Sequence, residues 1–441
     1  MATLRYPAKI TKTYLFQLSI PIFFSNLVIP LTGLVDTALM GHQGEAKFLA
    51  ATSIATSVIT MIFWSFGFLR MGTVGLVAQA LGKGDYREIV YTTIRNLGIA
   101  LFIGLIILFL KHPILFAIEH FFNTSDDTQF LISKYISIRL LSAPAELSMY
   151  VLVGLYLGLQ MTKHSSLIIS TFCILNIVLS IYFVSYLGLS IAGVALGTVI
   201  SAYISIFISL LYTYLFIKKK FNIIPRYRKI YISRKLLKLF NINFDIFIRT
   251  ILITFAFLWF IYQSSLLGED YLAINTILLQ FITLAAFILD AYAFSTEGVV
   301  GYSLGRKVLK SFMMTVNNSI KLSFFTGLVI SLIYLIFFKQ LINALTDLEF
   351  LRYLSYGFIF WVILMPPVAS FCYQFDGIFI GTSQTKEMRN SMIFSVAIFI
   401  ITTNFLVKEY NNDGLWFSLL LFMIMRSLSL RLFFNNITNK F

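Results

Sequence analysis

Charge and cysteine are both scarce in this chain. Only 12% of its 441 residues are Asp, Glu, Lys or Arg, whereas 59% are hydrophobic, and the mean hydropathy is +0.86. This composition excludes an ordinary soluble globular domain. The two cysteines, Cys173 and Cys372, lie far apart in apolar segments, which argues against a disulfide framework and a metal site. The turn at residues 82–85 lacks the spacing of a phosphate-binding loop, so the sequence predicts no nucleotide site and no cofactor.

Long apolar stretches fill the chain instead. Each runs for roughly 20 to 25 residues, enough for a helix to cross a hydrocarbon core of about 30 Å. The predicted spans are 14–39, 48–79, 91–110, 130–157, 166–187, 191–217, 239–265, 271–301, 312–338, 350–380, 390–407 and 414–434. We therefore predict an all-α integral membrane protein with twelve transmembrane helices.

Lysine and arginine are distributed unevenly around these spans. The formal net charge of +15 does not indicate nucleic-acid binding, because most bases lie near the two chain ends, Arg426 included, or in the even-numbered connections. The odd-numbered connections carry only Lys47, Lys111, Lys339 and Lys408. Since basic loops mark the cytoplasmic side, we predict a multi-pass protein of a bacterial inner membrane with both termini in the cytoplasm. Membrane lipids are expected partners of the basic loops.

A basic segment divides the chain into two halves. Residues 218–238 hold nine bases and no acid, and predict a cytoplasmic linker between an N-terminal six-helix lobe, 1–217, and a C-terminal one, 239–441. A shift of 223 residues lays one half on the other, with Pro144 on Pro367 and Gly154 on Gly377. Each half has an even number of spans, so the two bundles are predicted to be related by a pseudo-two-fold axis along the membrane normal. Many secondary transporters are built in this way.

Four sequence motifs add a family resemblance over essentially the whole chain. The runs are GLVDTALMGH, FWSFGFLRMGTVGLVAQALGKGD, FILDAYAFSTEGVVGYSLG and FDGIFIGTSQTKEMRNSM. They resemble the DinF branch of the MATE multidrug and toxic-compound extrusion transporters. The resemblance implies a pair of six-helix bundles that exports organic cations, driven by inward flow of H⁺ or Na⁺. It also implies a transporter rather than an enzyme.

Asp36 is the main candidate in the N-terminal half. It matches the first-span acid of this family, and a carboxyl group in an apolar chamber can hold either a proton or a cation, so that one displaces the other. The alternative is that Asp36 caps a backbone group or lies at the outer interface. Pro21 can kink the same span, and the resemblance implies a bend there when Asp36 is protonated.

Polar residues of the fifth and sixth spans are the expected neighbours of Asp36. Asn176 and Ser180 are four residues apart on one helix face, and Thr198 follows in the next span. The family has an acid or a second amide at the place of Ser180. With one carboxylate in this lobe, proton coupling is favoured over a Na⁺ site at Asp36 and Asn176. Asn176 could instead tie two helices together.

The C-terminal half has its own buried charges. Asp290 and Glu297 are seven residues apart and share a helix face, Asp376 lies in the tenth predicted span, and Arg249 lies in the seventh. Asp290 and Arg249 are predicted to pair, since an unpaired charge in the membrane is costly. Structural pairing and cation binding stay open for these acids.

Two other functions compete with cation export by a monomer. A flippase for lipid-linked oligosaccharides would share the paired bundles but line its cavity with arginines. An intramembrane prenyl or acyl transferase would need paired acidic metal motifs, and the pair at Asp126 and Asp127 is thin support for one.

Overall fold

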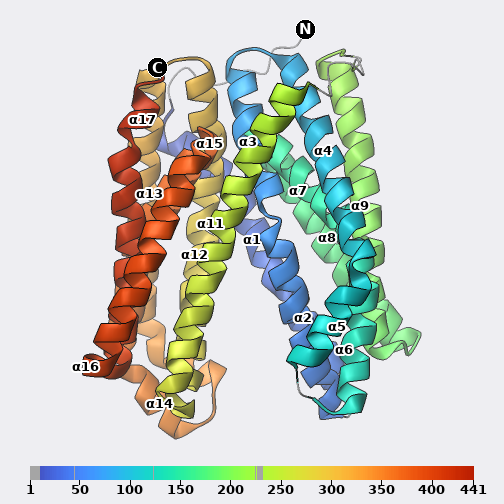
Figure 1. Cartoon of the computed structure of the whole chain (residues 1–441), viewed down its shortest axis with the longest axis vertical. Coiled ribbons are helices and arrows are strands. Elements are labelled where there is room, and N and C mark those ends of the chain that lie inside the picture. The colour runs from blue at the N-terminus through green and yellow to red at the C-terminus, as the bar shows by residue number, and fades with distance from the viewer. Residues whose placement is uncertain (1–9, 44, 123, 224, 226–231) are drawn as a thin grey trace. The chain divides into compact units, whose positions relative to one another are not determined.

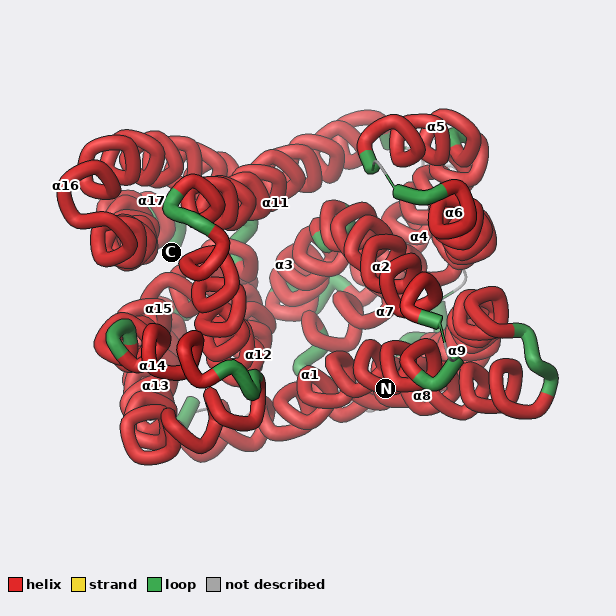
Figure 2. The backbone as a smooth tube through the Cα atoms, turned by 90° about the horizontal axis from the view of Figure 1, so that it is seen from below, coloured by secondary structure: helices red, strands yellow, loops and turns green. Residues whose placement is uncertain are grey.

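The computed structural model describes residues 10–43, 45–122, 124–223, 225 and 232–441, and these residues form helices and loops without a β-strand (Figure 1, Figure 2). Helices suit a bilayer because each one satisfies its own backbone hydrogen bonds. In chain order they are α1 Lys12–Gly41, α2 Ala46–Ser65, α3 Phe68–Gly82, α4 Tyr86–Phe109, α5 Lys111–Phe121, α6 Asp126–Arg139, η1 Leu140–Ser142, α7 Ala143–Gly158, α8 Thr162–Ile181, η2 Tyr182–Tyr186, α9 Ser190–Lys220, α11 Ser233–Leu266, α12 Glu269–Gly305, α13 Leu309–Leu345, α14 Glu349–Tyr356, α15 Ile359–Gly381, α16 Thr385–Phe433 and α17 Asn435–Thr438.

The membrane spans agree with the predicted all-α fold. Within the described residues, 11 helical segments are long and apolar enough to cross a bilayer. One of them contains α16, which holds two of the predicted spans, 390–407 and 414–434. Its helical path breaks at Asn411, where φ is 50° and ψ is −129°, inside the connection that the sequence predicts between these spans.

Three predicted spans are interrupted by turns that hydropathy does not reveal. The span at 48–79 is formed by α2 and α3, which are separated at Phe66 and Gly67. The span at 130–157 consists of α6, a 3₁₀ turn and α7, and Pro144 near the start of α7 favours a helix beginning there. The span at 350–380 is divided into α14 and α15 at Gly357 and Phe358.

The chain forms two compact units that do not follow the sequence order strictly. Among the described residues, unit 1 contains those from 24 to 240, and unit 2 contains 10–23 and 241–441. The beginning of α1 thus belongs to unit 2, and the beginning of α11 belongs to unit 1. Of the basic segment 218–238, the described parts end α9 and begin α11, while residues 224 and 226–231 lie outside the described residues.

Close helix contacts recur in the two units at the predicted shift of 223 residues. A Cβ atom on Gly154 would lie 2.5 Å from the carbonyl oxygen of Arg70, and one on Gly377 would lie 2.7 Å from that of Ala293. Two further contacts recur in the same way: Gly158 on Val74 with Gly381 on Glu297, and Gly104 on Pro144 with Gly327 on Pro367. Small residues spaced by four let the backbones approach closely. These paired contacts confirm the sequence repeat.

One helix in each unit lies at the centre of its packing. In unit 1, α7 packs against α3, α4, α8 and α9, and its residues are nearly all buried. In unit 2, α15 packs in the same way against α12, α13 and α16. These central helices carry Glu146 and Asp376, so two carboxylates enter the interior on rigid elements.

Candidate functional site: buried polar groups in each unit

Asp36 lies inside unit 1. It is on α1, five residues before the helix ends, and only 7% of its surface is exposed. Ser180 of α8 and Arg139 of α6 lie close enough to interact electrostatically with its carboxyl group. The Oδ1 atom of Asp36 is buried and has no hydrogen-bond partner in the described part of the chain. Asp36 is therefore a buried carboxyl group of unit 1.

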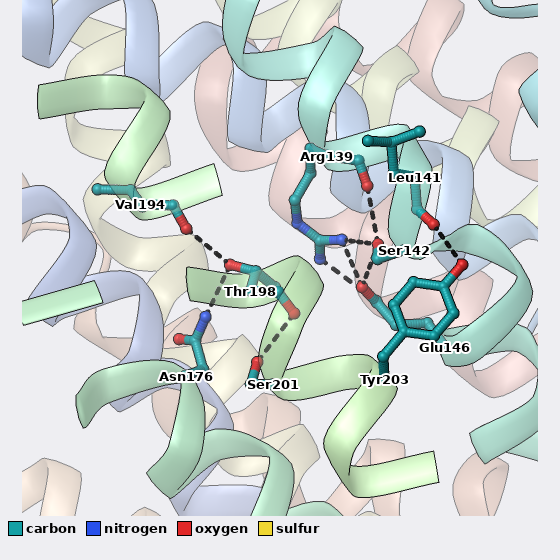
Figure 3. A network of polar contacts seen from close by, with 9 residues as sticks. All are labelled: Arg139, Leu141, Ser142, Glu146, Asn176, Val194, Thr198, Ser201 and Tyr203. Carbon is teal, nitrogen blue, oxygen red and sulfur yellow. Dashed lines mark hydrogen bonds and ion pairs between the residues drawn. The ribbon is translucent and has the colours of Figure 1, made fainter. Parts of the chain in front are cut away.

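The predicted neighbours on α8 and α9 are buried as well. Asn176, Ser180 and Thr198 are 2%, 0% and 5% exposed. Asn176 Nδ2 donates to Thr198 Oγ1 over 2.7 Å, and Thr198 Oγ1 donates to the Val194 carbonyl over 3.1 Å (Figure 3). This hydrogen bond joins α8 to α9, as expected if Asn176 ties two helices together. The same bond fixes the direction in which the amide of Asn176 points.

Three oxygen atoms of this region have no hydrogen bond of ordinary geometry, although the Ser180 hydroxyl, itself a donor, lies beside the Asp36 carboxyl group. They are Oδ1 of Asp36, Oδ1 of Asn176 and Oγ of Ser180, each buried and without a hydrogen bond among the described residues. Leaving a buried polar atom unpaired costs about 1–3 kcal/mol, so such atoms are rare and call for an explanation. A proton or a cation supplies what an unpaired acceptor lacks. We refer to Asp36, Asn176, Ser180 and Thr198 together as the acceptor site.

A buried ion pair borders the acceptor site. Arg139 Nη2 donates to Glu146 Oε2 over 3.2 Å, and its Nη1 contacts Glu146 Oε1 and the Ser142 hydroxyl (Figure 3). Ser142 Oγ also lies 2.7 Å from Glu146 Oε1, and the guanidinium carbon lies 5.1 Å from the centre of the Phe63 ring. The charge of Arg139 is thus already compensated by Glu146, although Asp36 is close by.

This pair is not among the site residues predicted from the sequence. Arg139 and Glu146 are seven residues apart, a spacing that places two side chains on one helix face. Both fall in the predicted span 130–157. The pair could have been predicted from the sequence because a base and an acid lie on one face of an apolar segment.

Unit 2 surrounds its central carboxylate with two arginines. Asp376 of α15 is 6% exposed, and its Oδ2 accepts from Arg426 Nη2 of α16 over 2.7 Å and from Arg249 Nη2 of α11. Arg426 was counted among the orienting bases near the end of the chain, but it is 3% exposed and lies inside unit 2. The structure corrects that assignment. Two arginines on one carboxylate favour structural pairing, because a further cation at Asp376 would be repelled.

The other two acids of unit 2 lie on α12. Asp290 is half-buried and acts electrostatically, like Asp376, on Tyr373. Glu297 is 1% exposed, and its backbone carbonyl faces Gly381 of α15. The pairing of Asp290 with Arg249 stays a prediction. Within the described residues, no group of three or more His, Cys, Asp or Glu side chains gathers as a metal site would require.

Pro21 lies inside α1, which is helical on both sides of it. Proline has no N–H, so the carbonyl of Gln17 one turn earlier loses its helical partner at this point. The residues that pass from unit 2 to unit 1, Phe23 and Phe24, follow two positions later. The missing hydrogen bond thus weakens α1 next to the point where the helix passes from unit 2 to unit 1.

Comparison with known proteins gives matches over most of the chain. A family model described as MatE matches residues 21–182 and 246–406. DNA damage-inducible protein F of Escherichia coli (strain K12) is 32% identical over 416 residues, which cover 94% of this chain and 90% of that protein. A solved structure described as MATE in the straight conformation has a TM-score of 0.88 at 19% identity. The superposition covers 97% of this chain and 96% of the chain in that structure. Another, described as MATE in the bent conformation, has a TM-score of 0.87 with the same identity and coverage. The structural matches support the fold alone.

Proposed function

The chain belongs to the MatE family of membrane transporters, and from this premise we propose that it is a secondary antiporter that exports cationic or amphipathic organic compounds in exchange for protons. Members of this family are transporters and not enzymes, which excludes the prenyl or acyl transferase alternative. They need no cofactor. We further propose that this chain works as a monomer in a bacterial inner membrane with both termini in the cytoplasm, because its basic loops favour that orientation.

The unpaired acceptors of the acceptor site carry this proposal. Oδ1 of Asp36 and Oδ1 of Asn176 are buried acceptors without a hydrogen bond among the described residues, and the Ser180 hydroxyl beside Asp36 can donate or accept. A proton on Asp36 would donate to a neighbouring acceptor, and a cationic substrate would satisfy the ionised carboxylate instead. Because both ligands use one carboxyl group, binding of either one favours release of the other, and this competition is sufficient for antiport.

Protons suit the acceptor site better than Na⁺. Asp36 is its only carboxylate, whereas hard cations take several oxygen ligands with negative charge among them. Na⁺ coupling at Asp36 and Asn176 is the competing outcome of the experiment below.

A flippase for lipid-linked oligosaccharides is the other transport function to separate. Such a protein would need open cationic groups for a pyrophosphate. Four of the buried arginines are each bonded to a carboxylate, which is the arrangement of structural charges: Arg95, Arg139, Arg249 and Arg426. We therefore place cation export first.

The test is efflux of a fluorescent organic cation from proteoliposomes under an imposed pH gradient and, separately, a Na⁺ gradient. We expect the pH gradient to drive the wild-type protein, and Asp36→Asn to reduce the rate to less than about a tenth, because an amide can neither bind a proton nor pair with a cation. Asp127→Asn is the matched control, since Asp127 has an exposed side chain that pairs with Lys47. Transport driven by Na⁺ alone, or an unimpaired Asp36→Asn protein, would contradict the proposed site.

A further inference from the structure

A row of hydroxyl groups runs along α9, away from the acceptor site. It starts at Thr198 and recurs every three or four residues, so its members share one helix face. None of them is more than 6% exposed: Thr198, Ser201, Ser205, Ser209 and Thr213. We refer to the last four as the hydroxyl row. The opposite face of α9 bears exposed apolar side chains, Phe207 and Leu211 among them, so the hydroxyl row faces the interior of unit 1.

The hydroxyl row meets the acceptor site at Ser180 of α8. The Ser180 hydroxyl lies beside Asp36, and a Cβ atom on Gly197 of α9 would lie only 2.7 Å from its oxygen. Ser180 therefore touches α9 one turn before Ser201, whose Oγ donates to the Thr198 carbonyl over 2.8 Å (Figure 3). The carboxyl group of Asp36 thus has a hydroxyl neighbour in contact with the helix that carries the row.

The other end of the hydroxyl row reaches the end of α9 that the basic segment predicts to be cytoplasmic. Thr213 Oγ1 lies 2.9 Å from the hydroxyl oxygen of Tyr156 on α7. The ring of His164, near the start of α8, stacks on that of Tyr156 with a centroid distance of 5.5 Å, and His164 is partly exposed. Three lysines, at residues 218–220, then end α9. The row leads from a buried carboxyl group to polar side chains near the end of the span.

Ser205, in the middle of the row, has an unsatisfied hydroxyl group. A serine within a helix commonly donates to a backbone carbonyl about one turn earlier, as Ser201 does. Ser205 is 1% exposed, and its Oγ has no hydrogen bond among the described residues. Leaving such an atom unpaired is costly, and a residue needed only for close helix packing could be alanine. The Ser205 hydroxyl therefore indicates a ligand that both donates and accepts hydrogen bonds.

Water is the ligand that fits the spacing of the hydroxyl row. Side chains four residues apart on a helix are separated by about 6 Å along its axis, so one water molecule between two hydroxyl groups can donate to one and accept from the other. Ser201, Ser205, Ser209 and Thr213 are spaced in this way. Water molecules between them would complete a continuous chain of hydrogen bonds through the cytoplasmic half of unit 1.

We propose that the hydroxyl row, joined by water, carries the proton of Asp36 toward the cytoplasm, which rests on the proton antiport proposed above. At each step a hydroxyl group or a water molecule accepts a proton from the side of the acceptor site and passes one of its own toward Thr213, so each regains its composition. The proton enters cytoplasmic water near Tyr156, and Asp36 is left as a carboxylate that can bind a cationic substrate. Each link needs water, so a dry row does not leak protons.

Two substitutions at Ser205 test the path in proteoliposomes. A pH dye trapped inside reports proton movement coupled to the substrate, and the fluorescent cation reports efflux. Ser205→Val removes the hydroxyl and fills its space, so we expect both rates to fall about tenfold under a pH gradient. Ser205→Thr has the same shape as Ser205→Val but keeps a hydroxyl, and should retain most of the wild-type rate. Equal losses in the two variants would show a packing role and would overturn the proposal.

A positional control and two further measurements separate the path from the acceptor site. Ser323→Ala, at a fully buried serine of α13 that also has no hydrogen bond among the described residues, should change neither rate. Ser205→Val should bind the fluorescent cation at equilibrium with an unchanged Kd, and D2O should slow this variant more than the wild-type protein, because proton transfer then limits turnover. An equal loss in Ser323→Ala, or a weakened Kd in Ser205→Val, would overturn the assignment of a proton path.

The same assays distinguish failure of the path from failure of the antiport itself. If the pH gradient drives the wild-type protein and Ser205→Val transports equally fast, the hydroxyl row is not the path, although proton antiport stands. If the pH gradient does not drive the wild-type protein, the proposed function fails, and the path fails with it.

Discussion

At the scale of single residues, the two units treat their buried carboxylates differently. Asp376 shares one oxygen between two arginines, and Glu146 holds Arg139 through both of its oxygens. Asp36 has Arg139 nearby, but that guanidinium is engaged by Glu146, and Asp36 Oδ1 has no donor among the described residues. Asp36, whose Oδ1 atom has no hydrogen bond among the described residues, is therefore the carboxyl group suited to exchange ligands. Glu146 and Asp376, which are paired with arginines, hold helices together.

Glu146→Gln tests this division of roles. It leaves the charge of Arg139 buried without its counter-ion, so we expect the free energy of unfolding to fall by about 3–5 kcal/mol. The double variant Arg139→Met/Glu146→Leu removes both charges and should cost much less. Thermal and denaturant unfolding in detergent provide the measurement, and Glu119→Gln, at an exposed acid on α5, is the control. Equal loss in the single and double variants would contradict a charge-pairing role.

At the scale of helices, the sequence predicts spans well and breaks within them poorly. Apolar length decides whether a segment crosses the bilayer, and the polar run at 408–413 predicts the break in α16 at Asn411. The break at Gly67 depends instead on how α2 and α3 pack, which local hydropathy does not encode. Amphipathic α5 and α14 are also too short for a span: α5 lies in a predicted connection, whereas α14 forms the beginning of the predicted span 350–380.

The site residues, too, could be predicted where local sequence determines them and not where the tertiary fold does. Asn176 and Ser180 could be predicted because they are neighbours on one helix, and Asp36 because it stands out in an apolar run. Arg426 could not be assigned to Asp376, since 50 residues separate them and only the tertiary fold brings them together.

Pro21 provides the prediction at the scale of one helix. We expect amide hydrogen exchange in residues 17–24, corrected for intrinsic rates, to differ between pH 6 and pH 8, because protonation of Asp36 alters α1 near its missing hydrogen bond. Pro21→Ala restores an N–H to the carbonyl of Gln17, and should slow exchange there and reduce the difference. Exchange that is identical at both pH values in the wild-type protein would count against a bend coupled to Asp36.

At the scale of the whole molecule, each unit is completed by the beginning of a helix that continues in the other. Leu15 of α1 is 1% exposed and packs on Val299 of unit 2, and Ser19 Oγ lies 2.8 Å from Ser295 Oγ. Leu239 of α11 is buried in unit 1 in a comparable way. A disturbance at the beginning of α1 should therefore weaken unit 2, although most of that helix belongs to unit 1.

The reactivity of the two buried cysteines can show which unit is weakened by a substitution in α1. Cys173 belongs to unit 1 and Cys372 to unit 2, and both are free. Leu15→Ala should cost about 2–5 kcal/mol and should speed thiol labelling of Cys372, with little change at Cys173. Leu69→Ala, at a fully buried residue of α3, should show the opposite pattern. Faster labelling of Cys173 in the Leu15→Ala protein would contradict the assignment of residues 10–23 to unit 2.

The exchanged helix beginnings also have a consequence for synthesis on the ribosome. Ser19 and Ser295 are separated by 276 residues, so at ~5–20 residues per second the start of α1 waits roughly 15 to 55 seconds for its partners on α12. During that interval Ile10, Leu15 and Leu18 have no native surface to cover them. The nascent chain thus carries an uncovered apolar segment at its front while six spans are inserted, and the insertion machinery or the lipid must shield it until the second half arrives.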